Sequence, residues 1–420
     1  MSSKLLFLSS ILPIFLFLLC LGAQGKVSYT GSEDDLGNLP AFSEDDNIMS
    51  RTLRALGDIY VINRTRDLIV GADLDYQSHR SLLEVPLDFK LKLLDVVLEA
   101  RPDILRVTPP FDPWLPLFWN DLGEIREHMT MIAKAIRDAG ADLMIADGGA
   151  EYYWDHPMDW PAFRDALLSR VRYLALAYQP EYYVVVKEPA WYQGLSWGSP
   201  GGMLTEIPTL DDWLELTEEA CRAVKSVSHS TVTMVSVIPG SEDHLPESAI
   251  YFREVQRIES VDAVGFDIYG IADLSRVDRI LADLPTSKPL WILETWDGHP
   301  DEQSAEWRIW SQSDWLALIA RYANHHEFEG VVTFYSRCFC YIGSDRPSNL
   351  VEWWNLLDRR TPAFYNFEKM ALKEKPLIGL LCGLSIAGFV RFKCCRDSIR
   401  RYPAGRRSSP DDHPVRTKHR

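Results

Sequence analysis

Short runs of apolar, mostly β-branched residues alternate along the chain with longer stretches in which apolar residues recur at helical spacing. A run of four to eight such residues between turn residues is typical of a strand buried on both faces of a parallel sheet. We predict strands at residues 68–72, 104–107, 143–146, 182–186, 232–237, 263–268, 290–293 and 331–334.

The stretches between these runs predict amphipathic helices, clearest at 122–139 and 160–178. Strand–helix units that repeat without a linker favour a closed (β/α)₈ TIM barrel of the α/β class, which we place at 66–370. A doubly wound open sheet is the alternative. It would ordinarily carry a glycine-rich phosphate-binding turn, and the pair Gly148-Gly149 lacks that spacing.

The two ends of the chain differ from the body. Residues 1–25 combine Lys4, an apolar run and small residues, and predict a secretory signal peptide. Residues 26–65 form an acidic leader or linker. Residues 376–390 carry no charge and precede a basic tail at 391–420, which predicts a type I membrane anchor with the tail inside. A removable sorting tail and a buried terminal helix remain alternatives, because fifteen residues span only about 22 Å.

Charge is distributed unevenly along the chain of 420 residues. The net charge is −16, yet residues 391–420 hold ten Lys or Arg against three Asp, a net of +7, which leaves −23 on residues 1–390. An acidic body of this kind repels nucleic acid, so we predict no nucleic-acid partner. We expect the body outside the cytoplasm, on the cell surface or secreted.

The cysteines do not indicate a disulfide framework. Only Cys221, Cys338 and Cys340 lie in the body, an odd number without metal-type spacing. The sequence predicts no metal and no cofactor, and it carries no signal for an oligomeric state.

Two glutamates follow predicted strands. Glu188 comes just after the run at 182–186, and Glu294 comes just after the run at 290–293. Parallel strands deliver both carboxylates to the same edge of a barrel. Two carboxyl groups across a cleft are what cleavage of a glycosidic bond requires, one as acid and the other as nucleophile or base. We therefore predict Glu188 and Glu294 as catalytic residues.

Other polar and aromatic residues gather at the same edge, where Trp and Tyr rings can stack on sugars and charged groups can bind hydroxyls. For one Trp, core packing is the commoner explanation; several together at strand ends favour a carbohydrate substrate. The predicted substrate-binding residues are Asp75, Arg106, Asp147, Trp154, Lys187, Trp191, Asp267, Tyr269, Trp296 and Tyr335.

These motifs resemble clan A of the glycoside hydrolases, retaining (β/α)₈ enzymes, over about residues 66–365. That clan commonly places its acid/base glutamate in Asn-Glu-Pro after the fourth strand, where Lys187-Glu188-Pro189 stands here, and its nucleophile after the seventh, where Glu294 stands. The segment 264–269 is similar to the clan's sixth strand. The resemblance implies that Tyr269 and Arg106 serve the nucleophile. It assigns no family within the clan.

Two positions depart from the clan's pattern. Lys187 replaces the Asn that contacts the 2-hydroxyl of the sugar, and an ammonium beside Glu188 would disfavour the protonated acid. Phe334-Tyr335 stands where the eighth strand normally presents a Trp. We expect a β-glycosidase that retains configuration. The alternatives are a barrel that binds glycans without cleaving them, and a lyase that forms a Schiff base at Lys187.

Overall fold

The structure is a computed structural model that describes residues 48–57, 67–74, 87–109, 122–146, 159–189, 208–284, 286–296, 305–334, 336–340, 357–358 and 360–372. All of them belong to the first of two compact units, Met1–Glu374. The predicted signal peptide, the anchor at 376–390 and the basic tail lie outside the described residues. Within the described part of the chain, no helix has the length and apolarity needed to cross a membrane.

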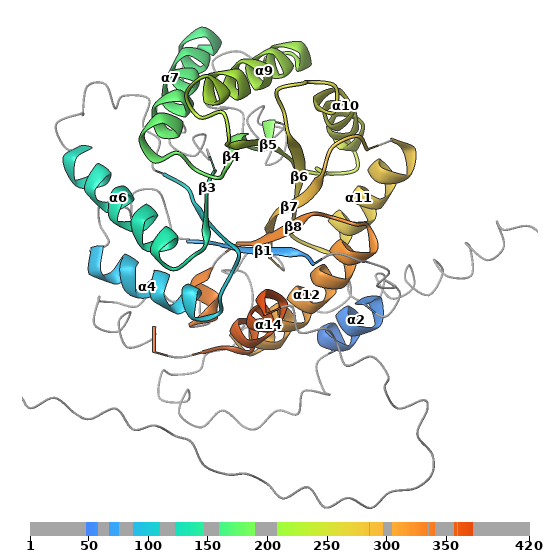
Figure 1. Ribbon diagram of the computed structural model, residues 1–420. Coiled ribbons are helices and arrows are strands. Elements are labelled where there is room, and N and C mark those ends of the chain that lie inside the picture. Colours follow the sequence, from blue (N-terminus) through green and yellow to red (C-terminus); the bar gives the residue numbers. More distant parts are fainter. Residues whose placement is uncertain are drawn as a thin grey trace, which may run out of the picture. The chain divides into compact units, whose positions relative to one another are not determined.

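Eight parallel strands form one closed barrel in chain order, and β1 pairs with β8 to close it (Figure 1). The predicted (β/α)₈ barrel is therefore confirmed. The strands are β1 (Ile69–Asp73), β2 (Ile104–Val107), β3 (Asp142–Ala146), β4 (Tyr182–Val186), β5 (Val232–Val237), β6 (Ala263–Ile268), β7 (Leu290–Thr295) and β8 (Gly330–Thr333).

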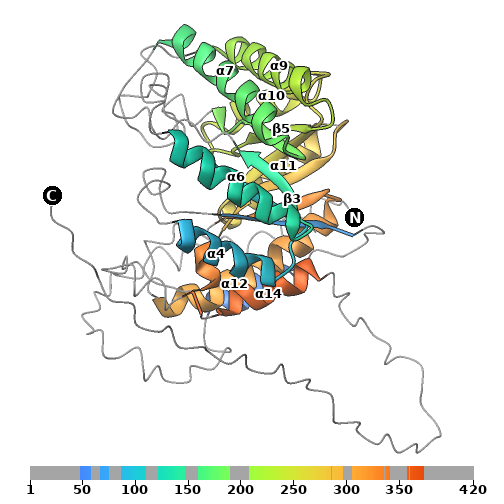
Figure 2. The same ribbon diagram turned by 60° about the vertical axis from the view of Figure 1, so that its left-hand side comes forward.

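Helices surround the barrel and cover the outer faces of its strands (Figures 1 and 2). They are α4 (Leu87–Glu99), α6 (Leu122–Asp138), α7 (Trp160–Tyr178), α9 (Leu210–Val227), α10 (Leu245–Val255), α11 (Ile271–Asp283), α12 (Ala305–His325) and α14 (Pro362–Ala371), with a short 3₁₀ helix, η4 (Ser336–Phe339). The predicted helix at 160–178 matches α7, whose N-terminus is capped by the Asp159 side chain.

Side chains fill the inside of the barrel. The buried inner layer consists of Ile104, Met144, Ala146, Val184, Met234, Ala263, Trp291, Leu293 and Val332. Two large members of this layer fit because glycine faces them on a neighbouring strand. A Cβ at Gly330 would lie 2.2 Å from Cζ3 of Trp291, and a Cβ at Gly265 would lie 2.3 Å from Cγ of Leu293. The barrel is therefore a packed core, and chemistry is confined to its rim.

An additional helix extends the folded domain beyond its predicted N-terminal boundary. Helix α2 (Ile48–Gly57) lies within the predicted leader at 26–65, but it packs beside α12 (Figure 1). Leu53 has no exposed surface and joins the hydrophobic core, while Arg54 forms an ion pair with Asp314 of α12 at 3.7 Å. The acidic residues around this segment hid a short apolar stripe, so a helix before residue 66 packs on the barrel domain.

Candidate active site

Glu294 reaches the inside of the barrel because the pairing of β6 with β7 is irregular. Phe266 pairs with Ile292, but the next residue of β6, Asp267, pairs with Glu294, so β7 holds one extra residue, Leu293. Strict alternation after the inward Leu293 would point Glu294 at the surrounding helices. A bulge in β7 resets the alternation and directs Glu294 into the rim beside Asp267, which faces inward by the regular alternation of β6.

Glu188 is placed by a second irregularity and by its own backbone. The pairing of β4 with β5 skips one residue between Val184 and Val186. Two residues later Glu188 has φ of 46°, in the left-handed region that residues other than glycine rarely adopt. Its backbone N–H donates to Oγ of the buried Ser236 of β5 at 3.1 Å. The carboxyl group is thereby turned toward the barrel axis and is nearly fully buried.

Glu294 is surrounded by donors. Nζ of Lys187 and Nη2 of Arg106 each lie 2.7 Å from Oε1 of Glu294, and the Tyr269 hydroxyl donates to Oε2. Burial would raise the pKa of Glu294, but the charges of Arg106 and Lys187 and the hydrogen bonds from Lys187 and Tyr269 outweigh it and lower that pKa to about 2. Glu294 is therefore an ionised carboxylate at neutral pH.

Tyr269 remains a donor under the same conditions. Burial, followed by the charges of Glu294 and Glu188, raises the pKa of the Tyr269 phenol well above its ordinary value. A phenol that keeps its proton can donate to Glu294 throughout the pH range of a working enzyme.

Arg106 fixes the position of the carboxylate from the opposite side. Its side chain is 1% exposed. Besides Glu294, it donates to Oδ2 of Asp73 at 3.0 Å and to the carbonyl oxygen of Leu293 at 2.9 Å. The guanidinium also lies 5.3 Å from the centre of the Phe334 ring, and Nζ of Lys187 lies 5.6 Å from it. Phe334 is thus a common aromatic support for both cations that hold Glu294.

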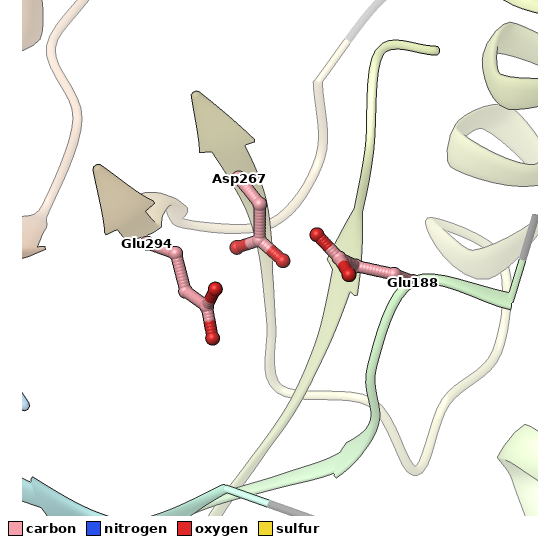
Figure 3. A group of neighbouring side chains, drawn as sticks. All are labelled: Glu188, Asp267 and Glu294. Carbon is pink, nitrogen blue, oxygen red and sulfur yellow. The ribbon is translucent and has the colours of Figure 1, made fainter. Parts of the chain in front are cut away.

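A third carboxyl group lies between the two predicted catalytic ones. Oxygen atoms of Glu188, Asp267 and Glu294 come within 4.8 Å of one another (Figure 3). Asp267 has no exposed surface. The sequence predicts no metal, yet this is a donor set that a cation could use. Lys187 and Arg106 both contact Glu294. They already supply positive charge at this end of the cluster.

The structure places the predicted site residues in three groups. Glu188, Glu294, Arg106, Lys187, Asp267 and Tyr269 come together as described. Asp75, Asp147, Trp154, Trp191 and Tyr335 lie outside the described residues.

Trp296 is the exception. Its side chain has no exposed surface and belongs to the hydrophobic core. The ring therefore packs against its neighbours here, and the substrate-binding role of Trp296 stays a prediction.

Two residues that the sequence analysis did not select support the site. Asp73 of β1 binds Arg106, and Ser236 of β5 anchors the backbone of Glu188. The signal for Asp73 was present in the strand pattern. Asp73 and Arg106 occupy inward positions of their strands, two residues after Gly71 and Ile104, and are paired in register. The hydroxyl of Ser236 gave no comparable signal, because serine is common at strand ends.

The chain matches no protein-family model, and no curated protein sequence matches it significantly. Solved structures do match in fold. The Streptomyces cattleya protein GH5_18 in complex with GlcNAc superposes with a TM-score of 0.52 at 15% identity, covering 74% of this chain and 82% of that one. A variant of the same protein in complex with Manβ1-4GlcNAc gives 0.51 at 14% identity, with the same coverage. The barrel that the resemblance to clan A implies is thus confirmed as a fold.

Proposed function

We propose that this protein is a retaining β-glycosidase, in which Glu294 is the nucleophile and Glu188 the acid/base. The observation that carries the proposal is the pair itself. Both glutamates lie at the carboxyl ends of barrel strands, with oxygens within 4.8 Å of each other. Retaining enzymes hold their carboxyl groups about 5–5.5 Å apart, whereas inverting enzymes need about 6.5–9.5 Å to admit a water. Similarity in fold to GH5_18 agrees with this reaction class.

The different surroundings of the two carboxyl groups support their different roles. Arg106, Lys187 and Tyr269 all contact Glu294, and all three contacts favour its ionised form. In the first step the Glu294 carboxylate attacks the anomeric carbon while Glu188 gives its proton to the departing oxygen. In the second step Glu188 takes a proton from water, whose oxygen attacks the anomeric carbon and releases Glu294.

Lys187 directly precedes Glu188 in the chain, but its ammonium is in contact with the Glu294 carboxyl group. An ammonium on Glu188 would oppose an acid, but Nζ of Lys187 lies on Glu294, where it favours the nucleophile. The same contact argues against a Schiff-base lyase. An amine must lose its proton to attack a carbonyl, and an ion pair with an ionised carboxylate holds that proton in place. Borohydride reduction in the presence of an aldehyde substrate should therefore not label Lys187.

Trapping identifies the nucleophile directly. The full chain is first tested against a panel of aryl β-glycosides to find the sugar that it accepts. The 2,4-dinitrophenyl 2-deoxy-2-fluoro derivative of that sugar should then attach covalently to Glu294, as seen by mass spectrometry of the labelled peptide. Glu188→Gln should still be labelled, because dinitrophenolate departs without a proton. A label on another residue would refute the assignment.

The acid/base is tested by rescue. Glu188→Ala should lose most activity on substrates with poor leaving groups and little on activated ones. Azide should restore turnover of an activated substrate and give a β-glycosyl azide. Glu247→Ala, an exposed glutamate of α10, serves as the control and should behave as the unsubstituted protein. An inverted product would contradict the mechanism. A protein that binds glycans but cleaves none of the panel would be a binding barrel instead.

We further propose that the barrel acts on an extracellular glycan or glycoconjugate. Support comes from the sequence alone, through the signal-like segment at 1–25, the uncharged segment at 376–390 and the basic tail. Protease added to intact cells should release a soluble, active body. A body that stays fully protected would contradict this location.

A further inference from the structure

Asp267 is a buried carboxyl group that the two-glutamate mechanism does not use. It lies on β6 between Glu188 and Glu294, and Figure 3 shows its carboxyl group directed toward that of Glu188. Its side chain has no exposed surface. Among the described residues its oxygens have no hydrogen-bond partner apart from the neighbouring Glu188 carboxyl group. An ionised carboxylate in such a place would lose its hydration without any replacement.

The charged groups around Asp267 explain which carboxyl group keeps a proton. Lys187 and Glu188 face it from the end of β4, Glu294 from β7, and Arg106 from β2. Both cations make their short contacts with Glu294. Three carboxylates within 4.8 Å cannot all be ionised in a buried site. Glu294 is in contact with both cations, and one proton shared by the other two carboxyl groups would remove the repulsion between them.

We propose that Asp267 and Glu188 share one proton and act together as the acid/base unit, with Asp267 as a positioning residue that retains this proton; the catalytic part rests on the proposed glycosidase function. Burial, then the charges of Glu294 and Glu188, raises the pKa of Asp267 well above its ordinary value, and a hydrogen bond to Glu188 adds to this. The contact between the two carboxyl groups is a hydrogen bond only when one of them is protonated.

The shared proton balances through both steps. In the first, Glu188 passes it to the leaving oxygen, the glycosidic bond breaks and the bond from Glu294 to carbon forms. The carboxyl pair then carries two negative charges, and the esterified Glu294 carries none. In the second, water returns a proton to the pair, its oxygen bonds to carbon, and Glu294 leaves as a carboxylate. The total charge of the three groups stays constant, which limits the cost of charging a buried site.

The decisive experiment needs no substrate, so it is independent of the proposed activity. Infrared spectra are recorded on the full chain labelled with ¹³C at the aspartate side-chain carboxyl carbon. At neutral pH we expect the C=O band of a protonated, labelled carboxyl group. This band should vanish in Asp267→Asn and remain in Asp283→Asn, which makes the same substitution at an exposed position at the end of α11. Absence of the band from the unsubstituted protein would overturn the proposal.

Pairing with Glu188 is tested in the same spectra. In Glu188→Gln one like charge is removed, so the pH at which the Asp267 band disappears should fall. An unchanged midpoint would show that the two carboxyl groups do not share a proton.

Titration with Mn²⁺ alone, followed by electron paramagnetic resonance, tests whether a bound cation neutralises the cluster instead. No saturable binding supports the shared proton, and a Mn²⁺ site that is lost in Asp267→Asn would overturn it.

The catalytic consequence is visible in a pH profile of the aryl glycosidase reaction. Asp267→Asn removes the negative charge that holds the proton on the pair, so the alkaline limb of kcat/KM should move to lower pH by about one unit or more. A residue needed only for folding would lower the whole profile without moving the limb. An unmoved limb in a folded, active Asp267→Asn variant would overturn the role of Asp267.

Discussion

The ammonium of Lys187 lies 2.7 Å from Oε1 of Glu294, although Lys187 is the chain neighbour of the other catalytic carboxyl group, that of Glu188. One strand end therefore supplies both the acid/base and a cation for the nucleophile. The arrangement depends on the skipped residue between Val184 and Val186, because this reverses the side-chain alternation before Lys187. A change in that register would bring the ammonium to a different group.

Removal of Lys187 should alter the acid side of the pH profile. Lys187→Met removes one of the two cations that lower the pKa of Glu294. That pKa should therefore rise by about one unit or more. Glu294 must be ionised to attack. The acid limb of the pH profile of the variant should therefore lie at higher pH than that of the unsubstituted enzyme. Lys134→Met, on the exposed face of α6, should leave the profile unchanged. A profile of kcat/KM with an unmoved acid limb would contradict this.

Tyr269→Phe tests the hydroxyl that donates to Glu294. Loss of a single donor to a reacting carboxylate should reduce kcat by about 10²-fold, by analogy with other donors to reacting oxygens. Tyr251→Phe is a suitable control, since Tyr251 is also buried and its hydroxyl contacts Thr217 at 2.9 Å, far from the site. We expect that control to affect thermal stability and to leave kcat intact.

Arg106 is expected to matter for stability as well as for activity. Arg106→Met would leave Asp73 and Glu294 buried without their guanidinium partner, at a cost of about 3–5 kcal/mol in the free energy of unfolding. Arg222→Met breaks an exposed ion pair with Glu218 and should cost less than about 1 kcal/mol. Urea denaturation of both variants measures the contrast, and equal losses would contradict the buried network.

Asp267 should reduce stability at neutral pH. Its pKa is raised above the ordinary value of 3.8, so the folded state holds the proton more tightly than the unfolded state. The unfolded state binds fewer protons once the pH exceeds that ordinary value, and stability then decreases as the pH rises. Asp267→Asn should therefore raise the free energy of unfolding at pH 7. This gain should disappear below about pH 4, and a gain independent of pH would contradict the shifted group.

The sequence predicts this fold well because each buried strand corresponds to a run of apolar residues. The pattern at 182–186 coincides with β4, and the one at 263–268 coincides with β6. The two glutamates were found for the same reason, since each closes such a run. What a run cannot show is a bulge, which depends on the pairing of two strands. The contact of Lys187 with Glu294 was therefore visible only in the structure.

Trp296 shows a second limit of prediction. A tryptophan at the end of a strand looks the same in sequence whether it faces a sugar or is covered by its neighbours. Only the packing of the assembled domain leaves Trp296 without exposed surface. Asp73 shows the reverse case, because its register with Arg106 could have been inferred from two aligned strands.

The left-handed backbone at Glu188 sets stability against activity at a single position. A side chain in that conformation costs on the order of 1–3 kcal/mol, which Gly avoids and Asn reduces. Replacement by either residue should also relieve the crowding of carboxylates. Selection of variants by heat resistance alone would therefore favour Glu188→Gly and Glu188→Asn, and would enrich proteins that survive heating but have lost their acid/base group. Engineering this barrel for durability thus requires an activity screen at every round.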